Sequence, residues 1–414
     1  MRSFSRMLRG VVLVCGLTAG LTGMDEAFAQ VPEDAPVLTP APEEKEEEEK
    51  KEPEEKEGFE GIGIPLVSYN TDLGFGIGAV GGAYYYSPGY TPYRHAMSAQ
   101  FFLTTEGVRN HYISYDGPNL LGRARLKVRA EYRRDLFFPF YGVGNVSAPD
   151  FDPAGSAPRE FAFDQFYPGG RVEITAKPLG NTHPLELSGG LAYHQVRIRP
   201  YPGSILEQTQ PVGIQGGHHG QVVVGVTWDT RDFEPDPIRG GVQEVSVRLS
   251  GAPTLSDYAY TGITLSGRYF WQLAPNVVFA QRVMLDALFG EVPVFVLADI
   301  SSIGIEGVGG MSSVRGVPRN RYVGNVKVIS NSELRFYVFE FNLLGEAVKI
   351  GGVGYFDVGR VWHPNVDDGP WWRWHPGVGT GLRVARLAAV VRLDYAVATE
   401  DFRQAVYVTF GHMF

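Results

Sequence analysis

The sequence contains a single cysteine, Cys15, among its 414 residues. Because Cys15 lies in an N-terminal apolar stretch, the rest of the chain offers no thiol for a disulfide bond, a cysteine-bound metal or a nucleophile. The sequence also has no Gly-x-Ser-x-Gly motif, no His-Glu-x-x-His motif and no clear Ser/His/Asp arrangement. We therefore expect no enzymatic activity, no catalytic residue, no metal site and no cofactor.

Long apolar runs are also missing beyond the N-terminus, where no stretch reaches the roughly 18 residues that a membrane helix needs. The mean hydropathy is near zero, and the chain is rich in glycine and aromatic residues, with 52 Gly, 21 Tyr and 25 Phe. This composition excludes helical membrane spans. It suits a transmembrane β-barrel, whose strands alternate in polarity and so average out to neutral hydropathy.

The N-terminus has the features of a secretory signal. Three arginines precede an apolar run at 11–24, and the triplet Ala27-Phe28-Ala29 fits the small-x-small cleavage pattern. We predict a signal peptide at residues 1–29. A lipoprotein anchor at Cys15 is the disfavoured alternative, because Val14 is larger than the usual preceding residue and the apolar run continues beyond it.

Residues 30–58 are rich in Pro and then intensely acidic. Residues 43–57 hold ten Glu and four Lys, a net charge of minus six. Such a run cannot bury a core, so we predict a disordered tether in the periplasm. A solvated spacer is the favoured interpretation, while the capture of a periplasmic chaperone or assembly partner through residues 31–58 stays open.

From residue 59 onward the chain reads as short segments of alternating polarity separated by turn residues. Between 125 and 133 every odd position is charged and every even position is apolar, and similar alternation returns at 331–338 and 391–395. In a soluble sandwich the apolar face would be the inside. So many strands carry charge on one face, however, that this face is better explained as the wet lumen of a barrel.

Counting the segments predicts an all-β fold, a 16-stranded antiparallel transmembrane barrel over residues 59–414. The long connections, at about 135–159, 200–218, 290–323 and 360–373, all follow odd-numbered strands, whereas most connections after even-numbered strands are short. Short turns at one end and long loops at the other are typical of an outer-membrane barrel with both termini in the periplasm. We expect strands at 60–69, 72–86, 93–104, 107–116, 122–134, 160–177, 184–199, 219–230, 241–252, 258–273, 276–289, 324–340, 346–359, 374–386, 387–398 and 403–414.

Five short stretches, in this order along the chain, then carry a family resemblance. They are Phe138 to Asn145, the turn sequence from Asp229, Arg231 and Asp232 to Pro237 and Gly240, the loop triplet Val314-Arg315-Gly316, Tyr355 to Gly359, and the terminal segment Phe410 to Phe414. Together they resemble the BamA-like outer-membrane assembly and translocation superfamily, also called the bacterial surface antigen family. The resemblance covers about 350 residues.

The resemblance implies a location in the bacterial outer membrane, in contact with its lipid and lipopolysaccharide, and no nucleic-acid partner. Neither the sequence nor the resemblance indicates the oligomeric state of the protein. The periplasmic POTRA domains that usually precede the family's barrel are not recognised, so the chain resembles the POTRA-less branch.

The long loop from Gly304 to Phe336 is the stretch around which we expect the barrel to be organised. In the resembled family the loop arginine, here Arg315 between Val314 and Gly316, enters the lumen and meets an acidic residue of the wall. Asp357 is the first candidate partner and Glu333 the second, because their strand positions share the face assigned to the lumen. Val317 stands where the family commonly has an aromatic residue, so we expect charge to hold the loop more than packing, and salt to loosen it.

The barrel should close by pairing its first strand with its last. The first strand contains Gly61, Gly63 and Pro65, and proline removes a donor from the ladder, which favours a weak seam. A harmless edge position for Pro65 is an equal alternative. The last strand should carry the terminal assembly signal from Phe410 to the aromatic Phe414, in which His412 departs from the preferred aromatic residue.

Two functions follow as hypotheses. The first is an assembly or translocation barrel that inserts or exports outer-membrane proteins, or handles lipid, through the weak seam. The second is a passive or gated pore, to which the charged lumen points.

Overall fold

The structure is a computed structural model that describes residues 57–414, apart from 91, 121, 123, 149–150, 152–158, 235, 302–304, 344–345 and 387–388. The predicted signal peptide, and the predicted tether except for its last two residues, lie outside the described residues. Both stay predictions.

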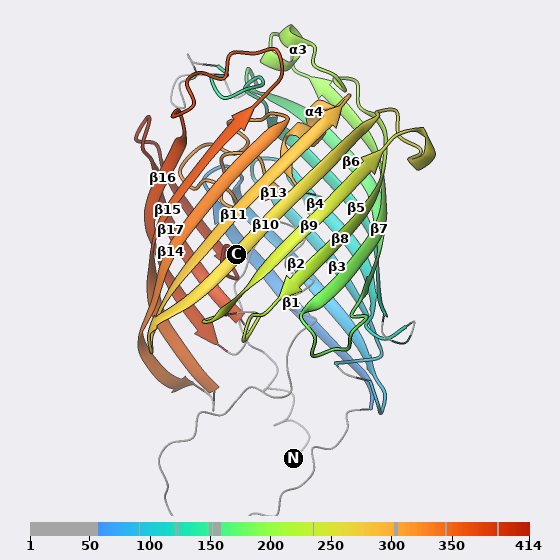
Figure 1. Cartoon of the computed structure of the whole chain (residues 1–414), viewed down its shortest axis with the longest axis vertical. Coiled ribbons are helices and arrows are strands. Elements are labelled where there is room, and N and C mark those ends of the chain that lie inside the picture. Colours follow the sequence, from blue (N-terminus) through green and yellow to red (C-terminus); the bar gives the residue numbers. More distant parts are fainter. Residues whose placement is uncertain are drawn as a thin grey trace, which may run out of the picture.

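Sixteen antiparallel strands close into one barrel, which confirms the predicted fold (Figure 1). Each strand pairs with its neighbour in the sequence, and β1 pairs with β18 to complete the ring. The strands are β1 (Gly58–Asn70), β2 (Gly74–Tyr86), β3 (His95–Thr104), β4 (Val108–Gly117), β5 (Ala124–Pro139), β6 (Ala162–Ala176), β7 (Leu185–Pro200), β8 (Gly217–Asp229), β9 (Gly240–Ser250), β10 (Tyr260–Ala274), β11 (Val277–Gly290), β14 (Val326–Leu343), β15 (Glu346–Trp362), β16 (His375–Arg386), β17 (Ala389–Ala398) and β18 (Gln404–Phe410).

Alternation along each strand separates a polar lumen from an apolar outer surface. In β5, Val128 and Tyr132 are exposed on the outside, while Arg129 and Asp135 are buried on the inside. Apolar side chains on the outer face of a transmembrane barrel contact lipid, whereas the lumen accepts charge. The charged face that the sequence shows is therefore the lumen face.

The two ends of the barrel differ in their connections. We call the end where β1 begins the lower rim and the opposite end the upper rim, as they stand in Figure 1. The long connections 140–161, 201–216, 291–325 and 363–374 all lie at the upper rim. They contain the short helices α3 (Ile205–Thr209) and α4 (Val294–Leu297), and the two-residue strands β12 (Asp299–Ile300) and β13 (Ile305–Glu306); the η1 turn (Ala252–Thr254) lies in a shorter upper connection. No helix among the described residues has the length and apolar content to cross a membrane.

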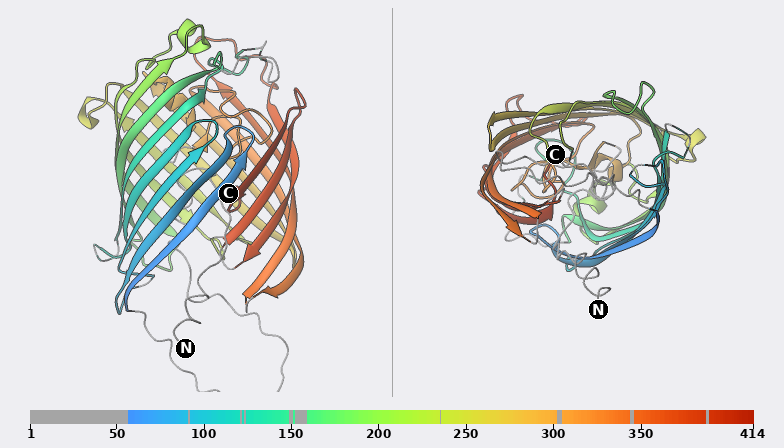
Figure 2. Two further views of the ribbon diagram at one scale, coloured as in Figure 1. Left: turned by 180° about the vertical axis from the view of Figure 1, so that it is seen from behind. Right: turned by 90° about the horizontal axis from the view of Figure 1, so that it is seen from below.

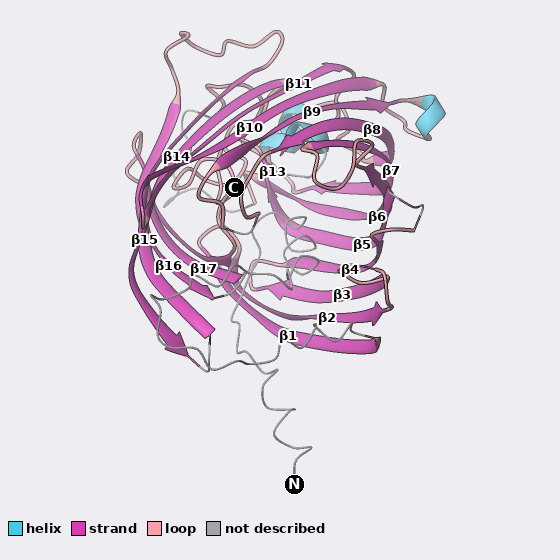
Figure 3. Cartoon of the chain, turned by 60° about the horizontal axis from the view of Figure 1, so that its bottom comes forward, coloured by secondary structure: helices cyan, strands magenta, loops and turns pink. Residues whose placement is uncertain are grey.

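The connection between β11 and β14 fills the upper part of the lumen rather than leaving the barrel (Figure 3). Its helix α4 is buried on all sides, and Phe295 and Leu297 pack with Phe138, Phe163 and Leu288 of the wall. A barrel of sixteen strands leaves a channel unless its own residues occupy it. Here an apolar core inside the lumen takes that place near the upper rim.

The seam between β1 and β18 is much shorter than the other strand pairings. All of β1, from Gly58 to Asn70, pairs with β2, but only Tyr69 and Asn70 pair with β18. Figure 2 shows β1 and β18 close together above and apart below. Gly61, Gly63 and Pro65 lie in the part of β1 that pairs with β2 alone.

The last strand is also shorter than predicted. The sequence predicted a strand to Phe414, but β18 ends at Phe410. Gly411 then adopts a positive φ of 72°, a conformation that suits glycine and turns the chain out of the sheet. Residues 411–414, which we call the tail, lie in the lumen (Figure 3). Continuing the register of β18 would have placed the tail opposite Pro65 and Gly63.

Thr71 joins the two sides of the seam at its upper end. Its amide donates to the Val406 carbonyl at 3.2 Å, and its hydroxyl accepts from the Val406 amide at 2.8 Å. Thr71→Val should speed hydrogen exchange at the Val406 amide about fivefold, because one hydrogen bond of about 1 kcal/mol is lost. Thr71→Ser should not. Thr399→Val, which removes a hydroxyl bond to the Pro376 carbonyl away from the seam, is the matched control, and an equal effect of both valine variants would contradict the assignment.

Candidate functional site

A loop segment inside the lumen places Arg315 against the wall. The segment 305–325 doubles back on itself through a bridge between Val308 and Tyr322. Gly316 has a φ of 92°, and a Cβ added there would lie 2.6 Å from the Ala398 amide nitrogen. Only glycine therefore allows the loop backbone to lie directly on β17. Gly377 on β16 meets the loop in the same way, because an added Cβ would lie 2.0 Å from the Arg315 carbonyl oxygen.

The Arg315 guanidinium binds Asp357 of β15 through two parallel hydrogen bonds. Its Nε donates to Oδ2 at 2.7 Å and its Nη2 donates to Oδ1 at 3.0 Å. The Arg315 backbone amide donates to the same carboxylate at 3.2 Å, and the Asn331 side chain donates to it at 2.9 Å. This bidentate geometry is the strongest form of an arginine–carboxylate pair. Asp357 was the first predicted partner.

Two further carboxylates meet the same guanidinium. Nη1 donates to Glu333 of β14 at 2.8 Å and to Asp394 of β17 at 3.2 Å. Arginine has five donors, so the two partners that the sequence presented as rivals both bind. Asp394 was not recognised as a partner, although its place on a charged strand face was the available signal. We call Arg315, Glu333, Asp357 and Asp394 the Arg315 cluster.

The cluster is sealed from solvent and bonded to further arginines. All four side chains are 0% exposed. The Tyr355 ring covers the guanidinium, with Cζ 3.4 Å from the ring centroid. Glu333 also accepts from Arg335 at 2.8 Å, and Asp394 from Arg383 at 2.6 Å. Burial by itself would lower the pKa of Arg315, but Asp357 and Glu333 hold that pKa well above its ordinary value, so the guanidinium stays charged.

Apolar packing next to Arg315 also holds the loop in the lumen. Val314 is fully buried and belongs to an apolar cluster with Val308, Val317, Ile329 and Val361. Val317, which stands where the family commonly has an aromatic residue, is therefore packed in an apolar core. Because the ion pairs are buried, mobile salt screens them weakly. The structure therefore predicts little salt sensitivity of the loop, which reverses the expectation drawn from Val317.

The loop also contacts both strands at the seam and the far wall. Gly316 donates its amide to the Tyr407 hydroxyl of β18 at 3.2 Å, and Asn70 of β1 donates to the Met311 sulfur at 3.1 Å. Arg319 donates to Asp135 of β5 at 2.7 Å, and its backbone amide donates to Asp72, between β1 and β2, at 3.3 Å. The loop thereby connects β1, β5 and β18 to the cluster wall.

The stretch from Phe138 to Asn145 supports the loop from the upper rim. Two hydrogen bonds hold Asn145 in place. Its backbone amide donates to the Asp368 carboxylate at 2.8 Å, and its side-chain oxygen accepts from the Val361 amide at 3.1 Å. Gly144 donates to the Val323 carbonyl of the loop at 2.8 Å. These contacts tie two upper-rim connections to the loop that carries Arg315.

The turn between β8 and β9 lies at the lower rim. Arg231 donates to Asp229 at 2.6 Å, and Asp232 accepts from the backbone amides of Phe233, Ile238 and Arg239 at 3.0 to 3.2 Å. Gly240 closes the turn with a φ of 89°, and Pro237 lies within it. The structure brings these residues together with one another but not with the Arg315 cluster.

That turn receives the tail. His412 contacts Asp236 at 2.8 Å, and Arg335 donates to the Phe414 backbone oxygen at 3.0 Å. The Phe414 ring lies 6.4 Å from the Phe270 ring, between centroids, and Ile238 of the turn belongs to the same apolar cluster. Phe414 is thus anchored in the lumen, and Phe410, the last residue of β18, pairs with Val391 of β17 but not with β1.

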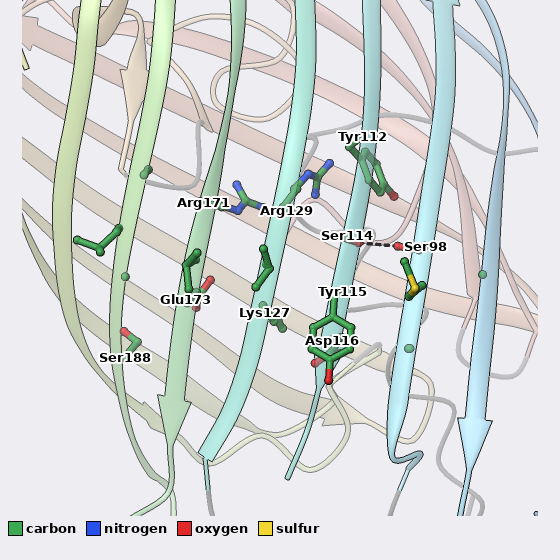
Figure 4. A pocket seen from close by; sticks show the side chains of 18 of the residues that line it. Ser98, Tyr112, Ser114, Tyr115, Asp116, Lys127, Arg129, Arg171, Glu173 and Ser188 are labelled. Atoms are coloured by element: carbon green, nitrogen blue, oxygen red, sulfur yellow. Dashed lines mark hydrogen bonds between the residues drawn. The ribbon is translucent and has the colours of Figure 1, made fainter. Parts of the chain in front are cut away.

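Below the loop, the lumen side of the wall from β1 to β9 lines a pocket of about 190 Å³ that is partly open to solvent. Its lining combines charged and hydroxyl side chains, among them Lys127, Arg129, Arg171 and Glu173 in Figure 4. Ile62 and Ile64 of β1 add an apolar strip. Within the described ranges, no group of three or more His, Cys, Asp or Glu side chains could hold a metal ion.

Comparison with known proteins gives a family match and two informative structural likenesses. A family model described as the Omp85 superfamily domain matches residues 85–414. The fold is similar to BamA from Haemophilus ducreyi lacking POTRA domains 1–3, with a TM-score of 0.57 and 16% identity over 86% of this chain and 70% of that one. It is also similar to CdiB from Escherichia coli, with a TM-score of 0.57 and 13% identity over 85% of this chain and 62% of that one. No curated protein matches the sequence.

Removing the guanidinium would leave three carboxylates buried without their shared cation. Arg315→Ala should lower the free energy of unfolding by roughly 3–5 kcal/mol, measured as a shift of the denaturant midpoint of the purified barrel in detergent. Arg321→Ala is the control, because Arg321 is also buried in the loop but donates only to Ser147 and the Ala148 carbonyl. Equal denaturant midpoints for the two variants would contradict a stabilising role of the Arg315 cluster. Release of the loop by 1 M salt in the wild-type protein would also contradict it.

A substitution at Gly316 tests the contact between the loop backbone and β17 without changing the charge of the Arg315 cluster. Gly316→Ala should destabilise the barrel by roughly 1–3 kcal/mol, since it adds both a steric overlap and an unfavourable φ. Gly354→Ala should have a small effect, because an added Cβ there meets nothing within 4 Å. Limited proteolysis of the loop is the readout, and a Gly316→Ala loop as resistant as wild type would exclude the tight contact.

Proposed function

Because the chain belongs to the Omp85 superfamily, we propose that it is a non-enzymatic barrel of the bacterial outer membrane that assembles or translocates other molecules through its β1–β18 seam. The molecules concerned are outer-membrane proteins, exported proteins or lipid. The observation that carries the proposal is the seam itself, in which two residues of β1 pair with β18 although thirteen pair with β2.

The seam has far fewer ladder hydrogen bonds than the pairing of β1 with β2. Each ladder hydrogen bond contributes about 1 kcal/mol to stability. Two register pairs and the bonds of Thr71 therefore oppose separation of β1 from β18 by only a few kcal/mol, whereas long ladders hold the remaining neighbours. An incoming strand could pair with the free edge of β1, because unpaired strand edges are templates for strand addition.

The inward loop would set where the seam opens. Through Tyr407 and Asn70 the loop contacts β18 and β1 at their upper ends, and the Arg315 cluster fixes it to β14, β15 and β17. Opening then starts at the lower rim, where no such contact exists among the described residues. In this account Arg315 is a positioning residue for the seam.

We place the predicted tether and the partners at the two rims and the outer face of the barrel. The lower rim faces the periplasm, where the tether of residues 30–58 and a chaperone bound to residues 31–58 would lie beneath the opening. The apolar outer face contacts outer-membrane lipid, and lipopolysaccharide contacts the upper rim. Lipid and lipopolysaccharide are the partners that any barrel in this membrane meets.

A passive or gated pore is the second candidate, and the polar pocket in the lumen along β1 to β9 favours it. The core around α4 and the loop above that pocket oppose it, since they fill the upper lumen. Planar-bilayer recordings separate the two. A pore predicts large, steady conductance that Arg315→Ala leaves unchanged, whereas the proposed function predicts low conductance that rises in that variant.

Covalent closure of the lower seam tests the proposal. Continuing the β18 register places Phe410 opposite Val67, so a Val67→Cys/Phe410→Cys pair should form a disulfide that blocks opening. Cells that depend on this variant should lose outer-membrane proteins or change their lipid profile under oxidising conditions, and recover with reductant. Ala99→Cys/Ile113→Cys, a register pair between β3 and β4, is the control. Unchanged protein and lipid profiles with the seam fully crosslinked would refute the proposal.

A further inference from the structure

Four arginines lie close together on the outer face of the barrel, near the upper ends of β4 to β7. In the strand register Arg109 of β4 lies directly opposite Arg134 of β5. Phe166 of β6 lies between Arg134 and Arg197 of β7 and is opposite both. Arg199 lies two residues above Arg197. We call the four arginines the basic patch. Neighbouring strands are about 4.8 Å apart, so the patch is about 14 Å wide.

The arginines of the basic patch point away from the lumen. On β7, Val196 is buried in the apolar core inside the lumen, so its neighbour Arg197 points outward, and Arg199 points the same way. On β4, Asn110 is buried in the lumen, and its neighbour Arg109 points outward. The side chains of Arg109, Arg197 and Arg199 are exposed. They therefore face the surroundings of the barrel.

The basic patch contains more positive charge than the protein neutralises. Arg134 donates to the Asp164 carboxylate through two hydrogen bonds, of 3.0 and 2.7 Å. The described residues provide no hydrogen bond or ion pair for the side chains of Arg109, Arg197 and Arg199. Four arginines beside one carboxylate leave three positive charges. Because like charges directly opposite each other destabilise a sheet, an external anion would stabilise this part of the wall.

The outward residues of β7 show at which depth of the membrane the patch lies. From below upward they are Leu191, Tyr193, Gln195, Arg197 and Arg199. Leu191 and Tyr193 are 62% and 40% exposed on the outer face. In a transmembrane barrel the apolar band ends in a girdle of aromatic residues at the level of the lipid head groups. The arginines begin just above that girdle, so they lie among the head groups.

A row of stacked rings lies directly below the arginines of β4 and β5. The ring centroids of Phe101 and His111 are 4.4 Å apart, and those of His111 and Tyr132 are 5.6 Å apart. Phe101 is 54% exposed and Tyr132 36% exposed. Rings at this depth pack against the upper parts of acyl chains and against sugar rings. The outer face thus offers apolar contacts below and positive charge above.

We propose that the basic patch binds the phosphate groups of lipopolysaccharide in the outer leaflet. Guanidinium groups bind phosphate through paired hydrogen bonds, and arginine suits this better than lysine because its donors form a planar fork. Lipopolysaccharide combines phosphate, sugar and acyl chains, which match the arginines and the rings below them. This inference rests on the orientation given above, with the upper rim outside. The site lies on β4 to β7 and leaves β1 and β18 free.

Native mass spectrometry of the full-length protein tests the inference, with bisphosphorylated lipid A as the probe. Arg109→Gln/Arg197→Gln should bind lipid A at least tenfold more weakly than the wild-type protein. Lys177→Gln/Arg239→Gln is the matched control, because it removes two positive charges next to β6 and β9 at the lower rim. The control should bind like the wild type. Equal affinities of the two double variants would overturn the inference.

Three further ligands test the chemistry on the wild-type protein, so this comparison does not depend on how a variant folds. Lipid A without its phosphates and phosphatidylglycerol should each bind at least tenfold more weakly than bisphosphorylated lipid A. Inorganic phosphate at 10 mM should not displace lipid A. Equal binding of lipid A with and without phosphate would overturn the inference. Equal binding of phosphatidylglycerol, or displacement by inorganic phosphate, would overturn the assignment to lipopolysaccharide. None of these results bears on whether the seam opens.

Discussion

A buried guanidinium that meets three carboxylates is the contact on which the rest of this barrel depends. Arg315 enters from a loop, while Glu333, Asp357 and Asp394 come from three different strands. Taking any one of these charges out of water alone would be costly; together, with Tyr355 over the guanidinium, they satisfy each other. The contact holds the loop in the lumen, and the loop in turn contacts β1 and β18.

The two halves of the seam consequently differ in strength. Above, loop contacts and Thr71 join β1 to β18. Below, the chain turns inward at Gly411, and no strand among the described residues pairs with this edge of β1. The tail is not idle, because His412 and Phe414 bind the turn between β8 and β9 and its neighbours. These contacts hold the tail in the lumen, away from the lower part of β1.

The fold was predictable because alternation of polarity persists through sixteen segments, and a charged lumen face is a strong local signal. Asp357 and Glu333 were found because strand parity places them on that face. Asp394 lies on a charged strand face as well, but strand parity marks many positions as facing the lumen and does not select the one that contacts Arg315. The inward tail was not predicted because the sequence gives no sign that the strand ends before Phe414. The turn at Gly411 and the contact between His412 and Asp236 direct the tail into the lumen. The apolar run of α4, within an apparent outer loop, was a usable signal of an interior core.

Residue-resolved hydrogen exchange of β1 in lipid is the measurement that tests the central claim most directly. Amides of residues 59–67 that point toward β18 should exchange rapidly, while those that point toward β2, together with the amides near Tyr69 and Asn70, should be protected. Such a pattern would demonstrate a seam held only at its upper end. Uniform protection along both edges of β1 would contradict the account, because it would mean that β18 and the tail pair with β1 along its whole length.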